Sequence, residues 1–252
     1  MKRVLKLRNV DKVEIIKLGG SLITNKNKPF SLKKDIIRKA INKIISGNEH
    51  TILIHGGGSY GHPIAKKFEI FDGYNPNVKN QLLGLSKTHQ AMNQLNSFII
   101  KEFINRDHPV ISVQPSSIFL KDGDEIIVHS IEILEFLLEL NILPVLYGDI
   151  ILDKQNSFSI ISGDRICLEI CKKLKYNISK VVFAMDREGI YVKGEHKDEP
   201  IILSDLKLED LENIHLMKLG EKIDVTGGIE GKIEEIKEIL RLKIPVQVGS
   251  FL

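Results

Sequence analysis

Residues 51–63, TILIHGGGSYGHP, join an apolar run that predicts a buried strand to a glycine-rich turn. Glycines let backbone N–H groups approach an anion closely, and Pro63 suits the first turn of a following helix, whose amino end favours negative charge. The spacing from Gly56 to Gly61 copies the nucleotide-triphosphate loop G-x-x-x-x-G-K-[ST]. His62 and Pro63 replace the Lys and the Ser or Thr of that loop, so an ordinary P-loop is excluded.

A second glycine turn follows the apolar run of residues 13–18, with Lys17 just before the turn and Lys26 a few residues after it. Either glycine pair alone is typical of a tight strand-to-helix connection. Two such turns at the carboxyl ends of strands in one sheet would instead form a single anion-binding crevice. The pair of turns therefore predicts a site for phosphate groups.

Strand-like and helix-like segments alternate along the chain, which predicts an α/β fold with a mainly parallel central sheet between two helical layers, a three-layer αβα sandwich. Strands are expected near 13–18, 51–55, 109–113, 143–147, 180–185 and 244–248, and helices near 33–46, 63–70, 79–107, 130–140, 163–174 and 228–242. Turn residues at 121–124 and 154–157 predict two β-hairpins at sheet edges. No internal repeat is visible, so we expect one compact folding unit.

Composition excludes several classes of function. A net charge of +3, with acids interspersed among the lysines, argues against nucleic-acid binding. No apolar run reaches the length of a membrane span and no signal peptide precedes the first strand, so we expect a cytoplasmic protein without membrane contact. Cys167 and Cys171 lie four residues apart on a predicted helix, but no further ligands complete a metal site, so buried reduced cysteines are expected.

Five motifs follow one another along the chain: KLGGS at 17–21, HGGGSYGH at 55–62, YGD at 147–149, SGD at 162–164 and DVTGG at 224–228. They stand in the order found in the amino acid kinase superfamily, and the sequence most resembles its isopentenyl phosphate kinase branch. The resemblance implies ATP- and Mg²⁺-dependent phosphorylation of isopentenyl phosphate to isopentenyl diphosphate in isoprenoid biosynthesis. It also implies a homodimer.

The resemblance further implies that residues 1–175 bind the phosphate acceptor and residues 176–252 bind ATP. Lys17 would contact the transferred phosphoryl group, Lys26 and Lys232 would neutralise charge that moves during transfer, and Asp164 would orient the lysines. Acceptor binding would fall to Gly57, His62, Asp149 and Gly163. The nucleotide would contact Lys17, Gly19, Gly20, Ser21, Gly58, Asp186, Gly227 and Lys232. No residue of the chain is expected to hold a metal by itself.

A histidine at position 62 makes chemical sense if the acceptor is a phosphomonoester. The second pKa of a phosphomonoester is ~6, so the acceptor oxygen is already a nucleophile at neutral pH and needs no general base. The site must then hold two polyanions close together. A histidine can donate hydrogen bonds to the acceptor phosphate, whereas His55 and His89 are expected to make packing or interior polar contacts.

Two departures from the family pattern bear on nucleotide binding. Arg165 follows Ser-Gly-Asp where a second acid is common, and residues 185–189 read MDREG where the family has Thr-Asp-x-Asp-Gly. Both predict weaker or less selective nucleotide binding. They leave open a catalytically weak nucleotide-binding regulator. A kinase for another small phosphate or phosphonate of the fosfomycin type, on the same scaffold, is a second alternative.

Overall fold

The structure is a computed structural model that describes residues 9–25, 27–193, 200–212 and 228–251. Within these residues the central sheet has seven strands in the order β12-β13-β9-β1-β2-β6-β3, and every neighbouring pair is parallel except β12–β13. The mainly parallel sheet is as predicted. Its strands are β1 (Val13–Leu18), β2 (His50–His55), β3 (Val110–Ser112), β6 (Leu143–Tyr147), β9 (Ile178–Ala184), β12 (Asp205–Leu206) and β13 (Val246–Gly249).

The register of the central strands aligns their carboxyl ends. Leu18 at the end of β1 pairs with His55 of β2 and with Ala184 of β9, and His55 pairs with Tyr147 of β6. The segments that follow these four strands therefore begin side by side at one edge of the sheet. Such an edge is where α/β proteins bind ligands.

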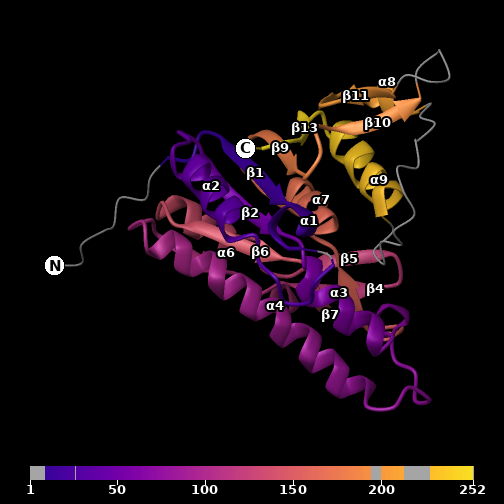
Figure 1. The fold of residues 1–252 in the computed structure, drawn as a ribbon. Helices are drawn as coiled ribbons and strands as arrows, with labels where there is room; N and C mark the ends of the chain where they lie inside the picture. Colours follow the sequence, from indigo (N-terminus) through magenta and orange to yellow (C-terminus); the bar gives the residue numbers. More distant parts are fainter. Residues whose placement is uncertain (1–8, 26, 194–199, 213–227, 252) are drawn as a thin grey trace.

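Helices cover both faces of the sheet, which completes the predicted three layers (Figure 1). One layer contains α1 (Gly20–Ile23), α2 (Lys34–Ile45), α3 (Gly58–Lys67) and α4 (Gln81–Ile104). The other contains α6 (Glu132–Glu139), α7 (Gly163–Lys173) and α9 (Gly228–Arg241). Apolar residues spaced three and four apart create the buried face of each long helix, as with Ile37, Ala40, Ile41 and Ile44 of α2.

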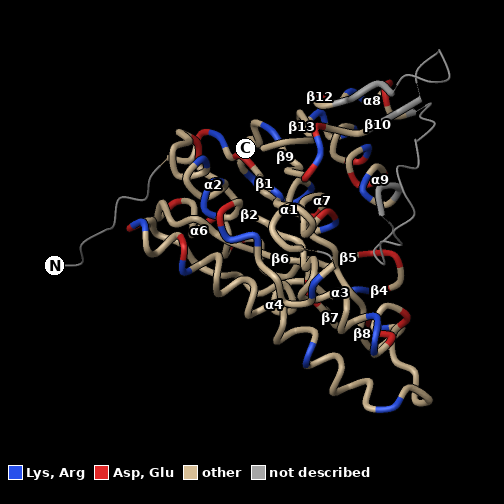
Figure 2. Tube along the Cα trace, in the orientation of Figure 1, with Lys and Arg blue, Asp and Glu red and all other residues tan. Residues whose placement is uncertain are grey.

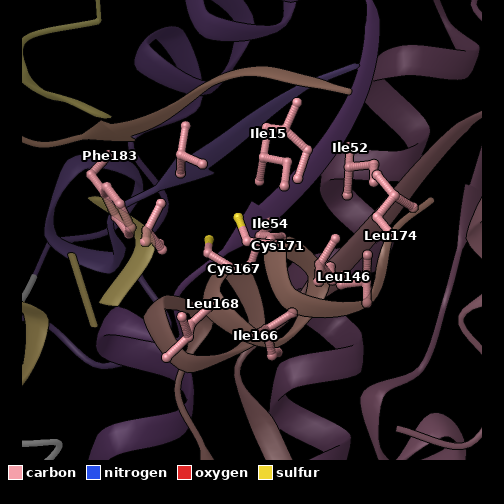
Figure 3. Close-up of a cluster of buried hydrophobic side chains, with 14 of the residues drawn as sticks. Ile15, Ile52, Ile54, Leu146, Ile166, Cys167, Leu168, Cys171, Leu174 and Phe183 are labelled. Atoms are coloured by element: carbon pink, nitrogen blue, oxygen red, sulfur yellow. The ribbon is translucent and has the colours of Figure 1, made fainter. Parts of the chain in front are cut away.

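Helix α7 shows how the core fixes one wall of the site. Its apolar residues, among them Ile166, Leu168 and the two cysteines, pack against Ile15, Ile52, Ile54, Leu146 and Phe183 of four central strands (Figure 3). Cys167 and Cys171 are free and buried in this cluster, as predicted. The packing holds the first turn of α7 at the carboxyl-terminal edge of the sheet.

Both predicted hairpins are present, but they do not lie at the edges of the central sheet. β4 (Phe119–Asp122) pairs with β5 (Glu125–Val128), β7 (Asp149–Asp153) pairs with β8 (Ser157–Ile161), and a parallel β4–β7 pair joins them into a separate four-stranded sheet. The physical reason is that a single residue, Gly148, separates the end of β6 from the start of β7. The second sheet therefore extends from the carboxyl ends of the central strands.

Smaller elements complete the described chain without having been predicted. They are the 3₁₀ helix η1 (Ile70–Asp72), α5 (Pro115–Ile118), the antiparallel hairpin β10 (Ile190–Lys193) and β11 (Pro200–Leu203), and α8 (Leu208–Glu212). Basic and acidic residues are interspersed along helices and loops, whereas β2 and β6 carry no Lys, Arg, Asp or Glu (Figure 2). None of the described helices is both long and apolar enough to cross a membrane.

Candidate active site

The two glycine turns pack directly against each other at the carboxyl-terminal edge of the sheet. A Cβ placed on Gly20 would lie 2.5 Å from the Gly58 nitrogen, and one on Gly56 would lie 2.9 Å from the Gly20 nitrogen. Gly58 also has a φ of +48°, a left-handed conformation that favours glycine, and a Cβ there would overlap Thr24 Oγ1. These glycines therefore permit the close approach of two loops.

Helix α3 begins at Gly58, five residues before the predicted start, so the expectation that Pro63 occupies its first turn was wrong. Thr24 Oγ1 accepts the Ser59 N–H at 2.9 Å and so provides a partner for one N–H group in the first turn of α3. Pro63 has no N–H to donate back to the Ser59 carbonyl, which instead accepts the Phe30 N–H at 3.2 Å. His62 consequently lies within the helix and is half-buried.

The amino end of α3 can receive an anion. Within the described chain, the N–H groups of Gly57 and Gly58 donate no hydrogen bond, and they precede a ten-residue helix. Unpaired N–H groups and the helix dipole together favour negative charge at such an end. The turn is therefore suited to phosphate oxygens.

Three charged side chains from three distant parts of the chain meet beside the turns. Asp164 Oδ1 lies 2.8 Å from Lys17 Nζ, and Asp164 Oδ2 lies 2.7 Å from Lys232 Nζ. Lys17 comes from the end of β1, Asp164 from the first turn of α7 and Lys232 from α9. A Cβ on Gly163 would lie 3.2 Å from Lys17 Cε, so the absence of a side chain at Gly163 leaves room for the Lys17 side chain. We call Lys17, Asp164 and Lys232 the triad.

The triad is an electrostatic unit with two positive charges and one negative charge, in which Lys17 is buried and the side chains of Lys232 and Asp164 are 12% and 16% exposed. Burial alone would raise the pKa of Asp164, but the two ammonium groups outweigh it and hold that pKa well below its usual range. Burial also opposes the charge on Lys17, yet Asp164 keeps the pKa of Lys17 above its ordinary value. Burial, aided by the like charge of Lys17, lowers the pKa of Lys232 to about 8. The unit carries excess positive charge at neutral pH.

A second buried carboxylate, Asp149, lies at the same sheet edge, at the start of β7. His89 Nδ1 of α4 lies 2.7 Å from Asp149 Oδ2, whereas Asp149 Oδ1 has no hydrogen-bond partner among the described residues. Asn93 connects His89 to Tyr147, because its amide contacts His89 Nε2 at 3.0 Å and accepts the Tyr147 hydroxyl at 2.5 Å. This polar chain holds Asp149 in place and leaves one of its oxygens available to a donor.

His55 has a structural place in the site. Its ring stacks on Tyr147 with centroids 5.4 Å apart, and Nε2 lies 3.3 Å from Asn96 Oδ1. Burial lowers the pKa of His55 to about 4, so the ring is neutral at physiological pH. This agrees with the expectation that His55 packs and shapes the loop.

The remaining predicted site residues are distributed around these features. Ser21 Oγ donates to Asp186 Oδ1 at 3.2 Å, which joins the first glycine turn to the segment after β9. The Gly19 N–H bonds the Ala184 carbonyl at 2.8 Å and holds that turn to the end of β9. Lys26 and Gly227 lie outside the described residues.

Sequence reasoning missed several polar residues that build the site. Thr24 fixes the start of α3, and Asn93 and Tyr147 extend the Asp149 contact. His89 was assigned an interior polar contact without a named partner. Helical spacing was the available signal, since His89, Asn93 and Asn96 fall on related turns of α4. The motifs at 55–62 and 147–149 marked the strand residues opposite them, but nothing in the sequence paired those residues with this helix.

Comparisons with known proteins agree with this geometry. A model of the amino acid kinase family matches residues 12–250. The isopentenyl phosphate kinase of Methanocaldococcus jannaschii is 35% identical over 89% of this chain and 86% of its own length, and that of Thermoplasma acidophilum is 32% identical over 94% and 90%. A crystal structure of isopentenyl phosphate kinase superimposes with a TM-score of 0.77 at 25% identity, covering 94% of this chain and 91% of that one.

Proposed function

The chain belongs to the amino acid kinase family and, within it, to the isopentenyl phosphate kinases, and we propose that it transfers the terminal phosphoryl group of ATP to isopentenyl phosphate. The product is isopentenyl diphosphate, a precursor for isoprenoid biosynthesis. The triad beside the paired glycine turns is the observation that carries the proposal. It concentrates positive charge where donor and acceptor phosphates would meet.

The protonation state of the triad fits a phosphate acceptor. Asp164 is held ionised by two ammonium groups, so it is a poor general base. A phosphomonoester needs none, because it is largely dianionic at neutral pH. In the proposal Lys17 and Lys232 stabilise charge on the transferred group, and Asp164 fixes their directions, since phosphoryl transfer depends mainly on alignment and electrostatic support.

The proposal divides the remaining predicted residues between the two substrates. His62, Gly57, Asp149 and Gly163 serve isopentenyl phosphate in the half formed by residues 1–175. ATP is assigned to the half formed by residues 176–252, with Asp186 and Gly227, and to Gly19, Gly20, Ser21 and Gly58 of the paired turns. Lys26 supports the transferred charge.

We propose that Mg²⁺ binds together with ATP. Among the described residues no group of three or more His, Cys, Asp or Glu side chains is arranged to hold a metal, and both oxygens of Asp164 already contact lysines. Nucleotide phosphates usually supply most ligands of such an ion, which neutralises their charge during transfer. We also propose a cytoplasmic location and a homodimer. Light scattering of the purified protein would test the dimer, because it measures the mass of the particle in solution.

Steady-state ADP release with ATP and a panel of monophosphates tests the proposed substrate. We expect isopentenyl phosphate to give a far higher kcat/KM than other alkyl phosphates or phosphonates such as fosfomycin. A preference for a phosphonate would support the fosfomycin-type alternative. ATP binding without turnover of any panel member would support the regulator and contradict the proposal.

A further inference from the structure

Arg165, the residue that departs from the family pattern, has partners on three elements outside the triad. Its Nε donates to Glu169 Oε1 of α7 at 2.7 Å, and its Nη2 donates to the Asp124 carbonyl in the β4–β5 turn at 3.3 Å. Its Nη1 lies 3.7 Å from Glu235 Oε1 of α9. The side chain is 30% exposed, and Glu169 is 4% exposed. One guanidinium therefore links α7, α9 and the second sheet.

The Arg165–Glu235 contact lies next to the Asp164–Lys232 contact of the triad. Arg165 directly follows Asp164, and Glu235 lies three residues after Lys232, so both contacts cross the same interface between α7 and α9 (Figure 1). Residues three apart share one face of a helix. A displacement of α9 that lengthens the Arg165–Glu235 pair would also move Lys232 away from Asp164.

Without Arg165 this interface would be repulsive. Glu235 faces Asp164 and Glu169 of α7, with Lys172 as the other nearby cation, and Glu235 is only 19% exposed. Burial raises the pKa of Glu235 to about 7, although Arg165 opposes that rise. Removing the guanidinium leaves two poorly solvated carboxylates, Glu169 and Glu235, facing each other across the helix pair.

We propose that Arg165 is a positioning residue for phosphoryl transfer, which holds α9 on α7 through Glu235 and thereby keeps Lys232 at Asp164. The role differs from the nucleotide contact that the family pattern suggests for this position. Arg165 acts on the kcat step through Lys232, and its contacts involve neither glycine turn. The effect on turnover rests on the proposed function, whereas the effect on α9 does not.

The test compares Arg165→Met, Glu235→Gln and the double variant from pH 7 upward, because loss of the guanidinium raises the pKa of Glu235 further above its wild-type value of about 7. Arg165→Met should lower kcat about tenfold or more, because small misplacements of catalytic groups are costly, while KM for isopentenyl phosphate changes less than about twofold. Glu235→Gln should have a smaller effect. The double variant should recover much of the kcat lost in Arg165→Met at each pH where Glu235 is ionised, since the neutral amide removes the repulsion.

Hydrogen–deuterium exchange gives a readout that does not depend on the substrate. Backbone amides of residues 228–241 should exchange faster in Arg165→Met than in the wild type and return toward wild-type rates in the double variant. Lys173→Gln is the matched control, because Lys173 is an exposed lysine of α7 that forms no ion pair with α9 among the described residues. It should leave both kcat and exchange unchanged.

The possible outcomes separate this role from others. A double variant as slow as Arg165→Met, unchanged exchange in α9, or a loss confined to KM would each overturn the positioning role. If the wild type fails to turn over isopentenyl phosphate, the proposed function fails, and the exchange comparison still decides the role of Arg165. If Arg165→Met does not fold, faster exchange of α9 in Glu235→Gln supports the role and unchanged exchange overturns it.

Discussion

Asp164 and Asp149 both belong to a Gly-Asp pair, but they have different charged neighbours and opposite pKa shifts. Each follows a glycine and lies at the carboxyl-terminal edge of the central sheet, where Asp149 is buried and Asp164 is half-buried. Asp164 contacts two lysines, and its pKa is held well below the usual range. Asp149 contacts one histidine and keeps one oxygen without a described partner, and burial raises its pKa.

The charge state of each Gly-Asp motif is therefore set by residues far away in sequence. Lys232 is 68 residues from Asp164, and His89 is 60 residues from Asp149. Two cations make Asp164 a permanent anion that orients lysines on the transfer side. A single imidazole leaves Asp149 with an acceptor oxygen on the side that we assign to isopentenyl phosphate.

The largest expected effect comes from Asp164→Asn, which removes the anion between two buried ammonium groups. We expect a loss of about 3–5 kcal/mol in the free energy of unfolding at neutral pH, the usual cost of breaking a buried charge pair. Because the folded pKa of Asp164 is depressed, its stabilisation is present above the ordinary pKa of 3.8 and is lost as the pH falls below it. Urea unfolding at several pH values measures both effects.

Asp35→Asn is the matched control for that measurement, because Asp35 is 91% exposed and 3.6 Å from Arg38. It should change stability by less than about 1 kcal/mol. An Asp164→Asn loss as small as this, or one that persists unchanged to low pH, would remove the contrast between the two aspartates.

Lys17→Met makes Asp164 resemble Asp149 by leaving it with one cation. We expect kcat to fall by a factor that corresponds to ~2.7–4 kcal/mol, because the lysine charge matters most as negative charge moves to the transferred group. ATP binding should remain detectable by calorimetry. Lys39→Met, an exposed lysine of α2, should retain normal turnover. Near-normal turnover in Lys17→Met would exclude Lys17 from the reaction.

His62→Ala tests whether the acceptor side is separate from the transfer side. We expect KM for isopentenyl phosphate to rise, with a loss in kcat/KM of roughly tenfold to more than a hundredfold, as for a lost hydrogen bond to a charged group. KM for ATP should change little. His129→Ala, at an exposed position, is the control. A loss that falls on ATP alone would assign residues 56–62 to the nucleotide.

We expect the smallest effect on stability from Asp149→Asn. The pH dependence of this stability change should have the sign opposite to that expected for Asp164→Asn. The amide oxygen can still accept the His89 proton, so stability at neutral pH should change by only about 1 kcal/mol. Because burial raises the folded pKa of Asp149, the ionised group destabilises the fold, and this cost appears as the pH rises from 3.8 through the folded pKa. Urea unfolding should therefore show the variant gaining relative to wild type as the pH rises.

The opposite trend, in which the wild type gains over Asp149→Asn as the pH rises, would show that His89 dominates the environment of Asp149. Burial would then fail to distinguish the two aspartates. Asp149→Asn combined with His89→Gln separates these contributions, because the double variant removes the titration of both partners.

Much of the fold was readable from the sequence, because its signals are local. Apolar runs and helical spacing predicted the main strands and helices within a few residues, and the structure confirms the αβα layers. The start of α3 was wrong because Thr24, rather than a residue next to the turn, satisfies its first-turn N–H. The hairpins were misplaced because sequence patterns do not state to which sheet a strand adds.

Local sequence was sufficient to predict the strand-to-glycine turns, the lysine before one turn and the histidine after the other, since these depend on neighbouring residues and backbone freedom. Tertiary packing set which charged side chains meet. Parallel register aligns the ends of β1, β2, β6 and β9, and the packing of α7, α9 and α4 then brings Lys232 to Asp164, Glu235 to Arg165 and His89 to Asp149. Electrostatic interactions depend on distance in space and on burial, and neither quantity is set by the residues adjacent in the chain.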